Sequence, residues 1–129
     1  MQLRVLFVED SEDDAALVLR ELKRIGYEVE AGRVEISSDM QAALGNKEWD
    51  LIICDYSLPS FDAPRALEIL KASEKDIPFI ILSGTIGEET AVATLKAGAH
   101  DFLLKGSLTR LGPVMERELR EAEIRRERK

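Results

Sequence analysis

Acidic residues directly follow two apolar segments of the sequence, and they are the residues best placed to do chemistry. Segment 51–54 is followed by Asp55, and segment 3–8 is followed by Glu9 and Asp10. If both segments are parallel strands, their carboxyl ends lie at one edge of a sheet, where ligands bind in open α/β folds. Three carboxylates at one edge repel each other unless a cation offsets their charge. The sequence therefore predicts a metal site formed by Glu9, Asp10 and Asp55.

Two further apolar segments also end in polar residues. Segment 79–82 is followed by Ser83, and segment 101–104 is followed by Lys105. Phosphoryl transfer depends on positioning and charge neutralisation, so a carboxylate nucleophile needs a divalent cation and a fixed ammonium group for the phosphoryl oxygens. Lys105 can supply the ammonium group, and the Ser83 hydroxyl can donate to a phosphoryl oxygen once one is present. This pattern predicts that Asp55 is a nucleophile and that Ser83 senses its phosphorylation.

Five predicted strands alternate with five predicted helices, which is typical of a parallel sheet with helices on both faces. Gly26 and Gly98 are expected to end the first and fourth helices, Ser38 or Asp39 to cap the second, and Asp62 to cap the third. The predicted strands are 3–8, 27–36, 51–55, 79–82 and 101–104, and the predicted helices are 12–25, 38–46, 62–70, 88–97 and the segment from 108 onward.

The composition sets limits on the class of protein. The chain has 129 residues, a net charge of −7, 45% hydrophobic residues and a single cysteine. This length suits one domain, and the negative charge argues against a nucleic-acid-binding protein. No apolar stretch approaches the ~20 residues that span a membrane, and the start lacks a signal-peptide pattern, so we expect a cytoplasmic protein. Cys54 is expected to be a small buried apolar residue, and His100 a solvated loop residue.

The final helix changes character along its length. An apolar stripe continues to Ala122, after which charged residues dominate. We therefore expect the docked part of the helix to end near Ala122. A Glu121–Arg125 pair beyond it would contribute only ~0.2 to 0.5 kcal/mol.

The combination of Glu9 and Asp10, Asp55, Ser83 and Lys105 resembles the receiver domain of two-component response regulators. That family has an acidic pair after its first strand, a phosphoacceptor aspartate after its third, a hydroxyl residue after its fourth and a lysine after its fifth. The resemblance covers about residues 3–122. It implies a flavodoxin-like α/β three-layer sandwich, with a five-stranded parallel sheet of order 2-1-3-4-5 and five flanking helices. Residues 1–122 would form the receiver domain, and 123–129 a charged helical extension or linker.

The resemblance also assigns roles at the metal site. Asp55 would be phosphorylated, and Mg²⁺ would be held by Asp10, Asp55 and the backbone carbonyl of Ser57. Glu9 would act through a metal-bound water. No other cofactor is expected.

The resemblance further implies that Asp55, Lys105 and Ser83 are the catalytic residues and that Ser83 and Phe102 form a switch. Phe102 lies three residues before Lys105, where the family places its switch aromatic residue, often a tyrosine. Gly106 departs from the family, which usually has proline after the lysine, commonly with a cis peptide bond. The geometry of the Lys105–Gly106 peptide is therefore open.

The expected partner is a sensor histidine kinase or a histidine phosphotransfer protein. Segments 83–89 and 105–108 look like those of receivers that stand alone or are joined to sensor or kinase domains. We expect no nucleic-acid or membrane partner, a monomer or weak dimer, and no enzymatic activity beyond magnesium-dependent self-phosphorylation and slow self-dephosphorylation.

Several alternatives are open. The residues from Glu9 to Asp14 could be an acidic first helical turn, and Asp55 with Lys105 a structural ion pair. A flavin-binding flavodoxin-like protein is disfavoured because this acidic segment would repel a flavin phosphate. An aspartyl-phosphate phosphohydrolase usually has a second acid two residues after its nucleophile, but Ser57 stands there. The domain could also be a docking module with no phosphorylation.

Overall fold

The structure is a computed structural model that describes residues 2–56, 62–84 and 88–127. Within these residues, five strands alternate with five helices. The strands form one sheet in the order β2-β1-β3-β4-β5, and every neighbouring pair is parallel, which confirms the predicted fold class and strand order. In chain order the elements are β1 (Gln2–Val8), α1 (Glu12–Arg24), β2 (Glu28–Val34), α2 (Ser37–Asn46), β3 (Leu51–Asp55), α3 (Ala63–Ala72), β4 (Phe79–Ser83), α4 (Glu88–Lys96), β5 (Asp101–Leu104) and α5 (Leu111–Glu127).

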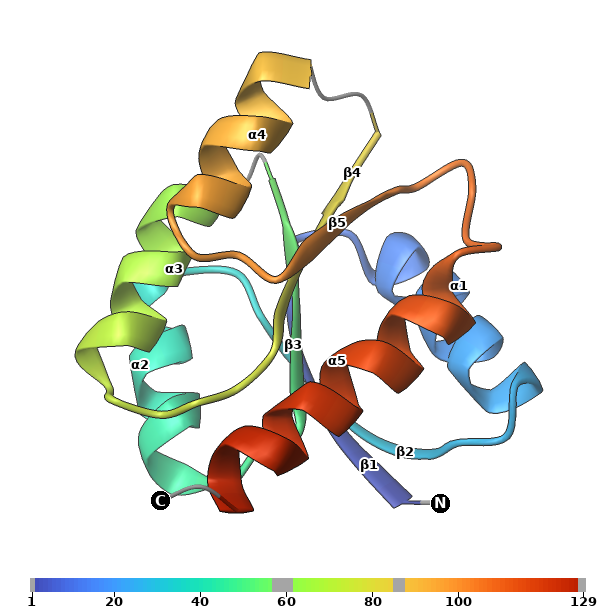
Figure 1. Ribbon diagram of the computed structural model, residues 1–129, viewed down its shortest axis with the longest axis horizontal. Coiled ribbons are helices and arrows are strands. Elements are labelled where there is room, and N and C mark those ends of the chain that lie inside the picture. Colours follow the sequence, from blue (N-terminus) through green and yellow to red (C-terminus); the bar gives the residue numbers. More distant parts are fainter. Residues whose placement is uncertain (1, 57–61, 85–87, 128–129) are drawn as a thin grey trace.

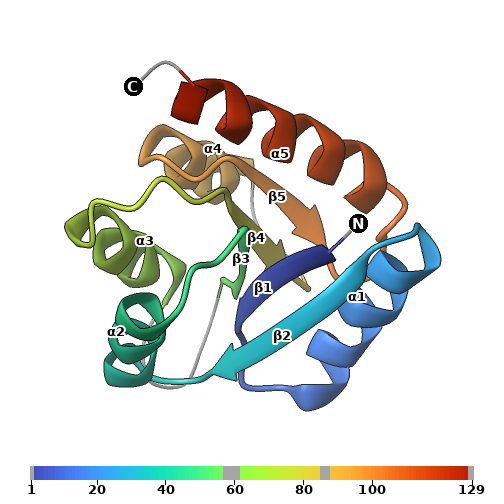
Figure 2. The same ribbon diagram turned by 90° about the horizontal axis from the view of Figure 1, so that it is seen from below.

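The helices cover the sheet on both faces. Helices α1 and α5 lie on one face, and α2, α3 and α4 lie on the other (Figures 1 and 2). Successive residues of β1 point to opposite faces, so Phe7 packs with Leu22 of α1, whereas Val8 packs with Met40 of α2. Strands β3 and β4 are buried along their whole length, as expected for central strands of a parallel sheet. Cys54 lies in β3 and is buried, as predicted.

Local signals define several helix ends. Helix α1 begins after Ser11, whose hydroxyl accepts a hydrogen bond from the Asp14 N–H at 3.2 Å, and Gly26 follows it at φ 110°. Asp62 caps α3, and Gly98 follows α4 at φ 122°. These positive φ values favour glycine. The Asp62 cap and both glycine exits were predicted correctly, whereas the Ser11 cap was not predicted.

Helix α2 begins differently from the prediction. It starts at Ser37, with Ile36 in the capping position and no side-chain hydrogen bond to the first turn. The prediction of Ser38 or Asp39 as the cap was wrong. Packing of Met40 and Leu44 in the core provides the stabilisation that a cap would otherwise give.

Strand β2 depends on a close contact between its backbone and an indole ring. A Cβ atom on Gly32 would lie 2.7 Å from Cη2 of Trp49. The Trp49 indole N–H donates to the Ala43 carbonyl at 3.0 Å, which fixes the ring against α2. Glycine is therefore the residue that allows Trp49 to close the core beneath this edge of the sheet.

Two expectations about single residues were wrong. Arg125 donates from Nε to both carboxylate oxygens of Asp76, at 2.9 and 3.1 Å, rather than pairing with Glu121. The last turns of α5 thus contact the domain beyond Ala122, so the expectation that the docked part of the helix ends near Ala122 was also wrong. The division of the chain into a domain and an extension after residue 122 stays a prediction. His100 is half-buried rather than solvated, and its Nδ1 accepts the Phe79 N–H at 2.9 Å. Burial and the charge of Arg125 lower the pKa of His100.

Among the described helices, none is long and apolar enough to cross a membrane.

Candidate functional site

The register of the sheet brings the predicted site residues to one edge. Cys54 of β3 pairs with Val8 of β1, so Glu9 and Asp55 follow at neighbouring strand ends. Ser83 ends the next strand, and its carbonyl accepts the Lys105 N–H at 2.8 Å. Four strands from distant parts of the sequence therefore deliver their polar ends to the same place.

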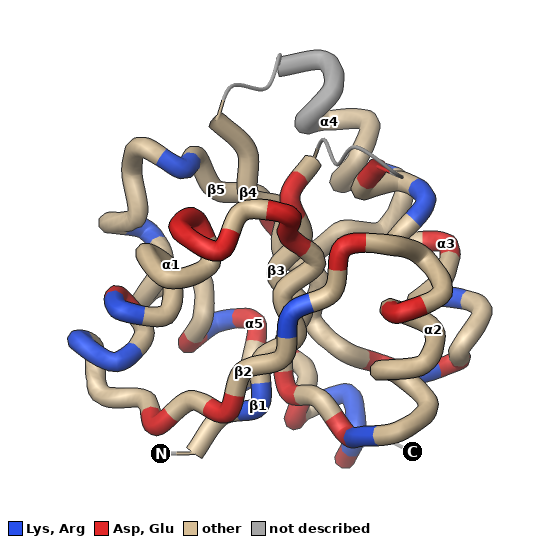
Figure 3. The backbone as a smooth tube through the Cα atoms, turned by 180° about the vertical axis from the view of Figure 1, so that it is seen from behind, with Lys and Arg blue, Asp and Glu red and all other residues tan. Residues whose placement is uncertain are grey.

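Glu9, Asp10 and Asp55 form an acidic cluster in which one carboxylate oxygen from each lies within 4.8 Å of the others. Glu9 and Asp55 are buried, with 2% and 8% of their surfaces exposed, whereas Asp10 is exposed. Figure 3 shows acidic residues gathered at the start of α1 and in the chain beside it. Clustered carboxylate oxygens form the type of site that hard divalent cations such as Mg²⁺ prefer.

Burial of Glu9 beside Asp55 carries an electrostatic cost. Burial and the neighbouring charge of Asp55 raise the pKa of Glu9 from its usual 4.5 to about 7, although the Ser11 N–H, 3.3 Å from Oε2, opposes the shift. Oε1 is buried and lacks a hydrogen bond, although it lies 3.4 Å from the Lys105 ammonium nitrogen. A cation bound by the cluster would satisfy this oxygen, so the residues present fit a divalent metal ion.

Lys105 supplies the positive charge beside the cluster. Its Nζ lies 3.4 Å from both Glu9 Oε1 and Asp55 Oδ2, and it donates to Asp14 Oδ2 at 2.6 Å. Burial disfavours the charged form, but the hydrogen bond to Asp14 and the charges of Glu9 and Asp55 outweigh it and raise the pKa of Lys105. The ammonium group is thus fixed at the edge of the site in its charged form.

Sequence reasoning missed the part that Asp14 plays, because it treated this residue only as one member of an acidic helical turn. It also missed Arg33 at the end of β2. Arg33 donates to the Glu9 carbonyl at 3.1 Å and to Glu12 Oε1 at 3.2 Å, which ties the loop after β1 to its neighbouring strand. Neither contact has a local signal, since each joins residues far apart in the chain.

The remaining predicted site residues lie as follows. Ser83 is buried at the end of β4, and Phe102 of β5 is half-buried against the core that α2, α3 and α4 cover. Ser57 lies outside the described residues. The described residues contain no cis peptide bond, so the Lys105–Gly106 peptide is trans, and the loop is closed by a bridge between Leu104 and Ser107.

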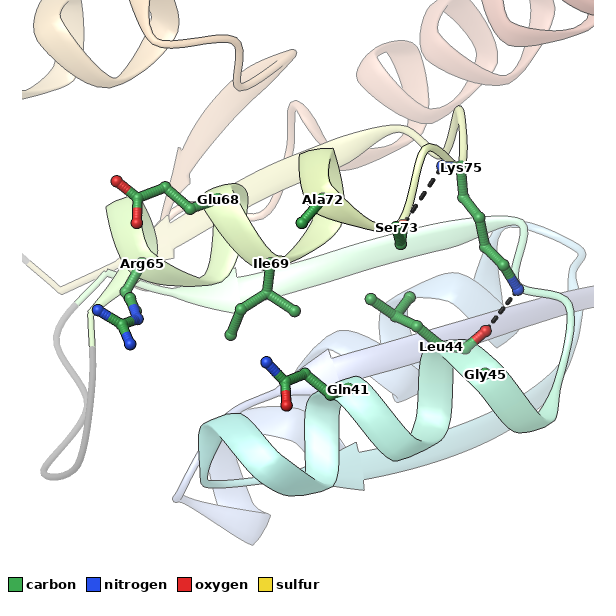
Figure 4. A pocket seen from close by; sticks show the side chains of 9 residues that line it. All are labelled: Gln41, Leu44, Gly45, Arg65, Glu68, Ile69, Ala72, Ser73 and Lys75. Carbon is green, nitrogen blue, oxygen red and sulfur yellow. Dashed lines mark hydrogen bonds between the residues drawn. The ribbon is translucent and has the colours of Figure 1, made fainter.

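A separate pocket of about 630 Å³ lies between α2 and α3 (Figure 4). It contains none of the predicted site residues, and the Lys75 ammonium closes one end by donating to the Leu44 carbonyl. Its charged lining residues are Arg65 and Glu68 of α3 and Lys75 of the segment after it, and they form no convergent acidic or nucleophilic group. Among the described residues, the carboxylates that converge are those of the acidic cluster. The pocket is lined by Gln41, Leu44, Gly45, Arg65, Glu68, Ile69, Ala72, Ser73 and Lys75.

Comparison with protein families gives a match to the response regulator receiver domain over residues 5–112. This range includes the described site residues at all four strand ends.

Curated relatives are longer than this chain. The transcriptional regulatory protein PrrA of Mycobacterium tuberculosis is 35% identical over 102 residues, which is 79% of this chain and 43% of PrrA. The nitrogen assimilation regulatory protein NtrX of Azorhizobium caulinodans is 32% identical over 126 residues, which is 95% of this chain and 27% of NtrX. The chain thus spans less than half the length of these relatives.

Solved structures match nearly the whole fold. The signal receiver domain of a LuxO repressor protein from Vibrio parahaemolyticus has a TM-score of 0.84 and 28% identity, covering 97% of this chain and 95% of that one. The signal receiver domain of a histidine kinase from Syntrophus aciditrophicus has a TM-score of 0.76 and 29% identity, covering 92% and 91%. The matches include receivers of regulators and of a kinase, so the expected subclass stays a prediction.

Proposed function

This chain belongs to the response regulator receiver domain family of two-component systems, and from that premise we propose that Asp55 is its phosphoacceptor. The observation that carries the proposal is the position of Asp55, in contact range of both the acidic partners and the Lys105 ammonium group. In the transfer, the bond between phosphorus and a donor histidine nitrogen breaks, and a bond forms between phosphorus and an Asp55 carboxylate oxygen. The freed nitrogen keeps its electron pair, and Lys105 offsets charge on the phosphoryl oxygens.

The acidic cluster would hold the metal ion that the family uses. Asp10 and Asp55 would be direct ligands, together with the Ser57 carbonyl, and Glu9 would act through a bound water. Mg²⁺ in this position supplies charge neutralisation for the phosphoryl oxygens. The burial of Glu9 Oε1 without a hydrogen bond supports this assignment.

The output of the domain would depend on Ser83 and Phe102. The Ser83 hydroxyl would donate to a phosphoryl oxygen on Asp55, and Phe102 would then rotate toward the sheet. Two packing arrangements of this kind change a surface that a partner can read. The expected phosphodonor is a sensor histidine kinase or a histidine phosphotransfer protein in the cytoplasm. A further sensor or kinase domain in the same chain, a monomeric or weakly dimeric state and the absence of a nucleic-acid partner also remain predictions.

The proposed phosphoacceptor can be tested by chemical phosphorylation. Acetyl phosphate should label Asp55 when magnesium is present and leave it unlabelled when magnesium is removed. Borohydride trapping followed by peptide mass spectrometry identifies the labelled residue. Asp55→Asn should abolish the label, whereas Asp13→Asn, which removes an exposed carboxylate from the nearby helical turn, should retain it. Label on another residue, or undiminished label in Asp55→Asn, would contradict the proposal.

A further inference from the structure

The Lys105 ammonium group is bonded to a residue outside the acidic cluster. Its Nζ is 2.6 Å from Asp14 Oδ2 but 3.4 Å from the nearest oxygens of Glu9 and Asp55. A charge-assisted hydrogen bond has a length near 2.7–2.9 Å, so the contact with Asp14 is the one real hydrogen bond among the three. In this state, the group assigned to the phosphoryl oxygens is engaged elsewhere.

The start of α1 explains why Asp14 is available for this bond. Ser11 caps the helix and accepts the Asp14 N–H at 3.2 Å, which fixes the Asp14 backbone. In a capping box, an acidic residue at this position would bond back to the N–H of the capping residue. Here Glu9 Oε2 already accepts the Ser11 N–H, at 3.3 Å. The Asp14 carboxylate therefore points to the other donor within reach, which is Lys105.

We propose that Asp14 is a positioning residue that holds Lys105 back from the phosphoryl site. Lys105 must then exchange its bond to Asp14 for a bond to a phosphoryl oxygen when Asp55 is modified. The proposal rests on the proposed function, because it requires Lys105 to bind those oxygens. The bond to Asp14 stabilises only the unmodified state, so it lowers the affinity of the protein for a phosphoryl group or its analogue.

Substitution of Asp14 tests this competition. Beryllofluoride binds as a phosphoryl analogue, and its affinity can be measured by titration at saturating magnesium with NMR detection. Asp14→Asn keeps the size of the side chain and should bind the analogue roughly three- to tenfold more tightly than the wild-type protein, the range expected for one partly exposed charged hydrogen bond. Asp14→Ala should also bind beryllofluoride more tightly than the wild-type protein.

Asp13→Asn is the matched control. Asp13 lies in the same helical turn, carries the same charge and is exposed. Its substitution should change the affinity by less than about twofold, since only general charge is lost. An equal gain in Asp13→Asn and Asp14→Asn would overturn the proposal, as would weaker binding in Asp14→Asn, which would mean that Asp14 helps Lys105 to reach the phosphoryl group.

A double-mutant cycle shows whether the effect passes through Lys105. In a Lys105→Ala background, Asp14→Asn should leave the affinity for beryllofluoride unchanged, and a gain of the wild-type size there would overturn the proposal. A readout without magnesium completes the test: the Lys105 ammonium resonance should be protected from exchange in wild type and Asp13→Asn, and lost in Asp14→Asn. Failure of the wild-type protein to bind beryllofluoride at all would instead overturn the proposed function, and this inference with it.

Discussion

Glu9 is the most deeply buried of the three carboxylates in the acidic cluster, and its pKa is raised. Lys105 lies beside it, yet the nitrogen is 3.4 Å from Oε1 and forms its hydrogen bond with Asp14 instead. The desolvation of Glu9 is therefore only partly offset. Without a bound cation, the three carboxylates should therefore lower the stability of the folded protein.

The first prediction follows from the raised pKa of Glu9. Because that pKa increases from 4.5 in the unfolded chain to about 7 in the folded protein, the folded form binds more protons between these values. The free energy of unfolding, measured without metal, should fall by about 2 to 3 kcal/mol as pH rises from about 4.5 to about 7. Urea unfolding at several pH values, followed by circular dichroism, measures this change.

Glu9→Gln should remove that part of the pH dependence, because the amide does not titrate. The difference between the wild-type and variant curves isolates Glu9 from other groups. Parallel curves would show that Glu9 is not the residue that titrates.

The second prediction concerns Ser83, whose hydroxyl would donate to a phosphoryl oxygen only after Asp55 is phosphorylated. Ser83→Ala should still be labelled at Asp55, but beryllofluoride should cause less than about half of the wild-type amide shift changes around Phe102. The reason is that the hydrogen bond that shifts the packing equilibrium is lost. Two-dimensional NMR measures the shifts. Wild-type shift changes in the variant would rule out Ser83 as the link to Phe102.

At the scale of elements, the sequence predicts those features that local chemistry controls. Asp62 caps its helix and Gly26 ends another, because both act on neighbouring backbone groups. The predictions of the partner of Arg125 and of the environment of His100 were wrong, because each depends on a residue that folding brings close from a distant part of the chain. The same reason explains which parts of the site could be predicted. The acids at the strand ends were predictable from local sequence, but the bond from Lys105 to Asp14 was not, because it joins residues 91 positions apart.

The third prediction tests the contact between β2 and the indole ring. Gly32→Ala should destabilise the protein by about 1 to 3 kcal/mol, because its Cβ would lie 2.7 Å from the Trp49 ring. Gly45→Ala is the control, since a Cβ there meets no atom within 4 Å and alanine favours helix. It should stabilise by about 0.5 kcal/mol. Thermal unfolding measures the stability of both variants. Equal changes in stability would mean that the Trp49 ring moves away from the added Cβ at no energetic cost.

At the scale of the whole molecule, the repulsion between carboxylates and the proposed function are located at the same edge of the sheet. The two cores on either side are apolar and continuous, whereas the carboxylates and Lys105 gather where four strands end. The sheet keeps the three carboxylates together although they repel one another. Ligand binding at this edge should therefore be coupled to the stability of the entire fold.

The fourth prediction is that magnesium stabilises the folded protein. At a concentration about 100 times the dissociation constant, the free energy of unfolding should increase by about 2.7 kcal/mol. Asp10→Asn should reduce this gain strongly, because a ligand is lost from the cluster. Asp13→Asn should retain it. Differential scanning calorimetry with and without magnesium gives the comparison, and an equal gain in Asp10→Asn would argue against a shared metal site.

Trp49 has a consequence for how this molecule can be observed. It is the only tryptophan in the sequence, it is 6% exposed, and it precedes β3, at the opposite end of that strand from Asp55. Its fluorescence emission should therefore report loss of the core and remain nearly unchanged when a metal ion or a phosphoryl analogue binds. The protein thus carries an intrinsic optical probe that separates unfolding from signalling.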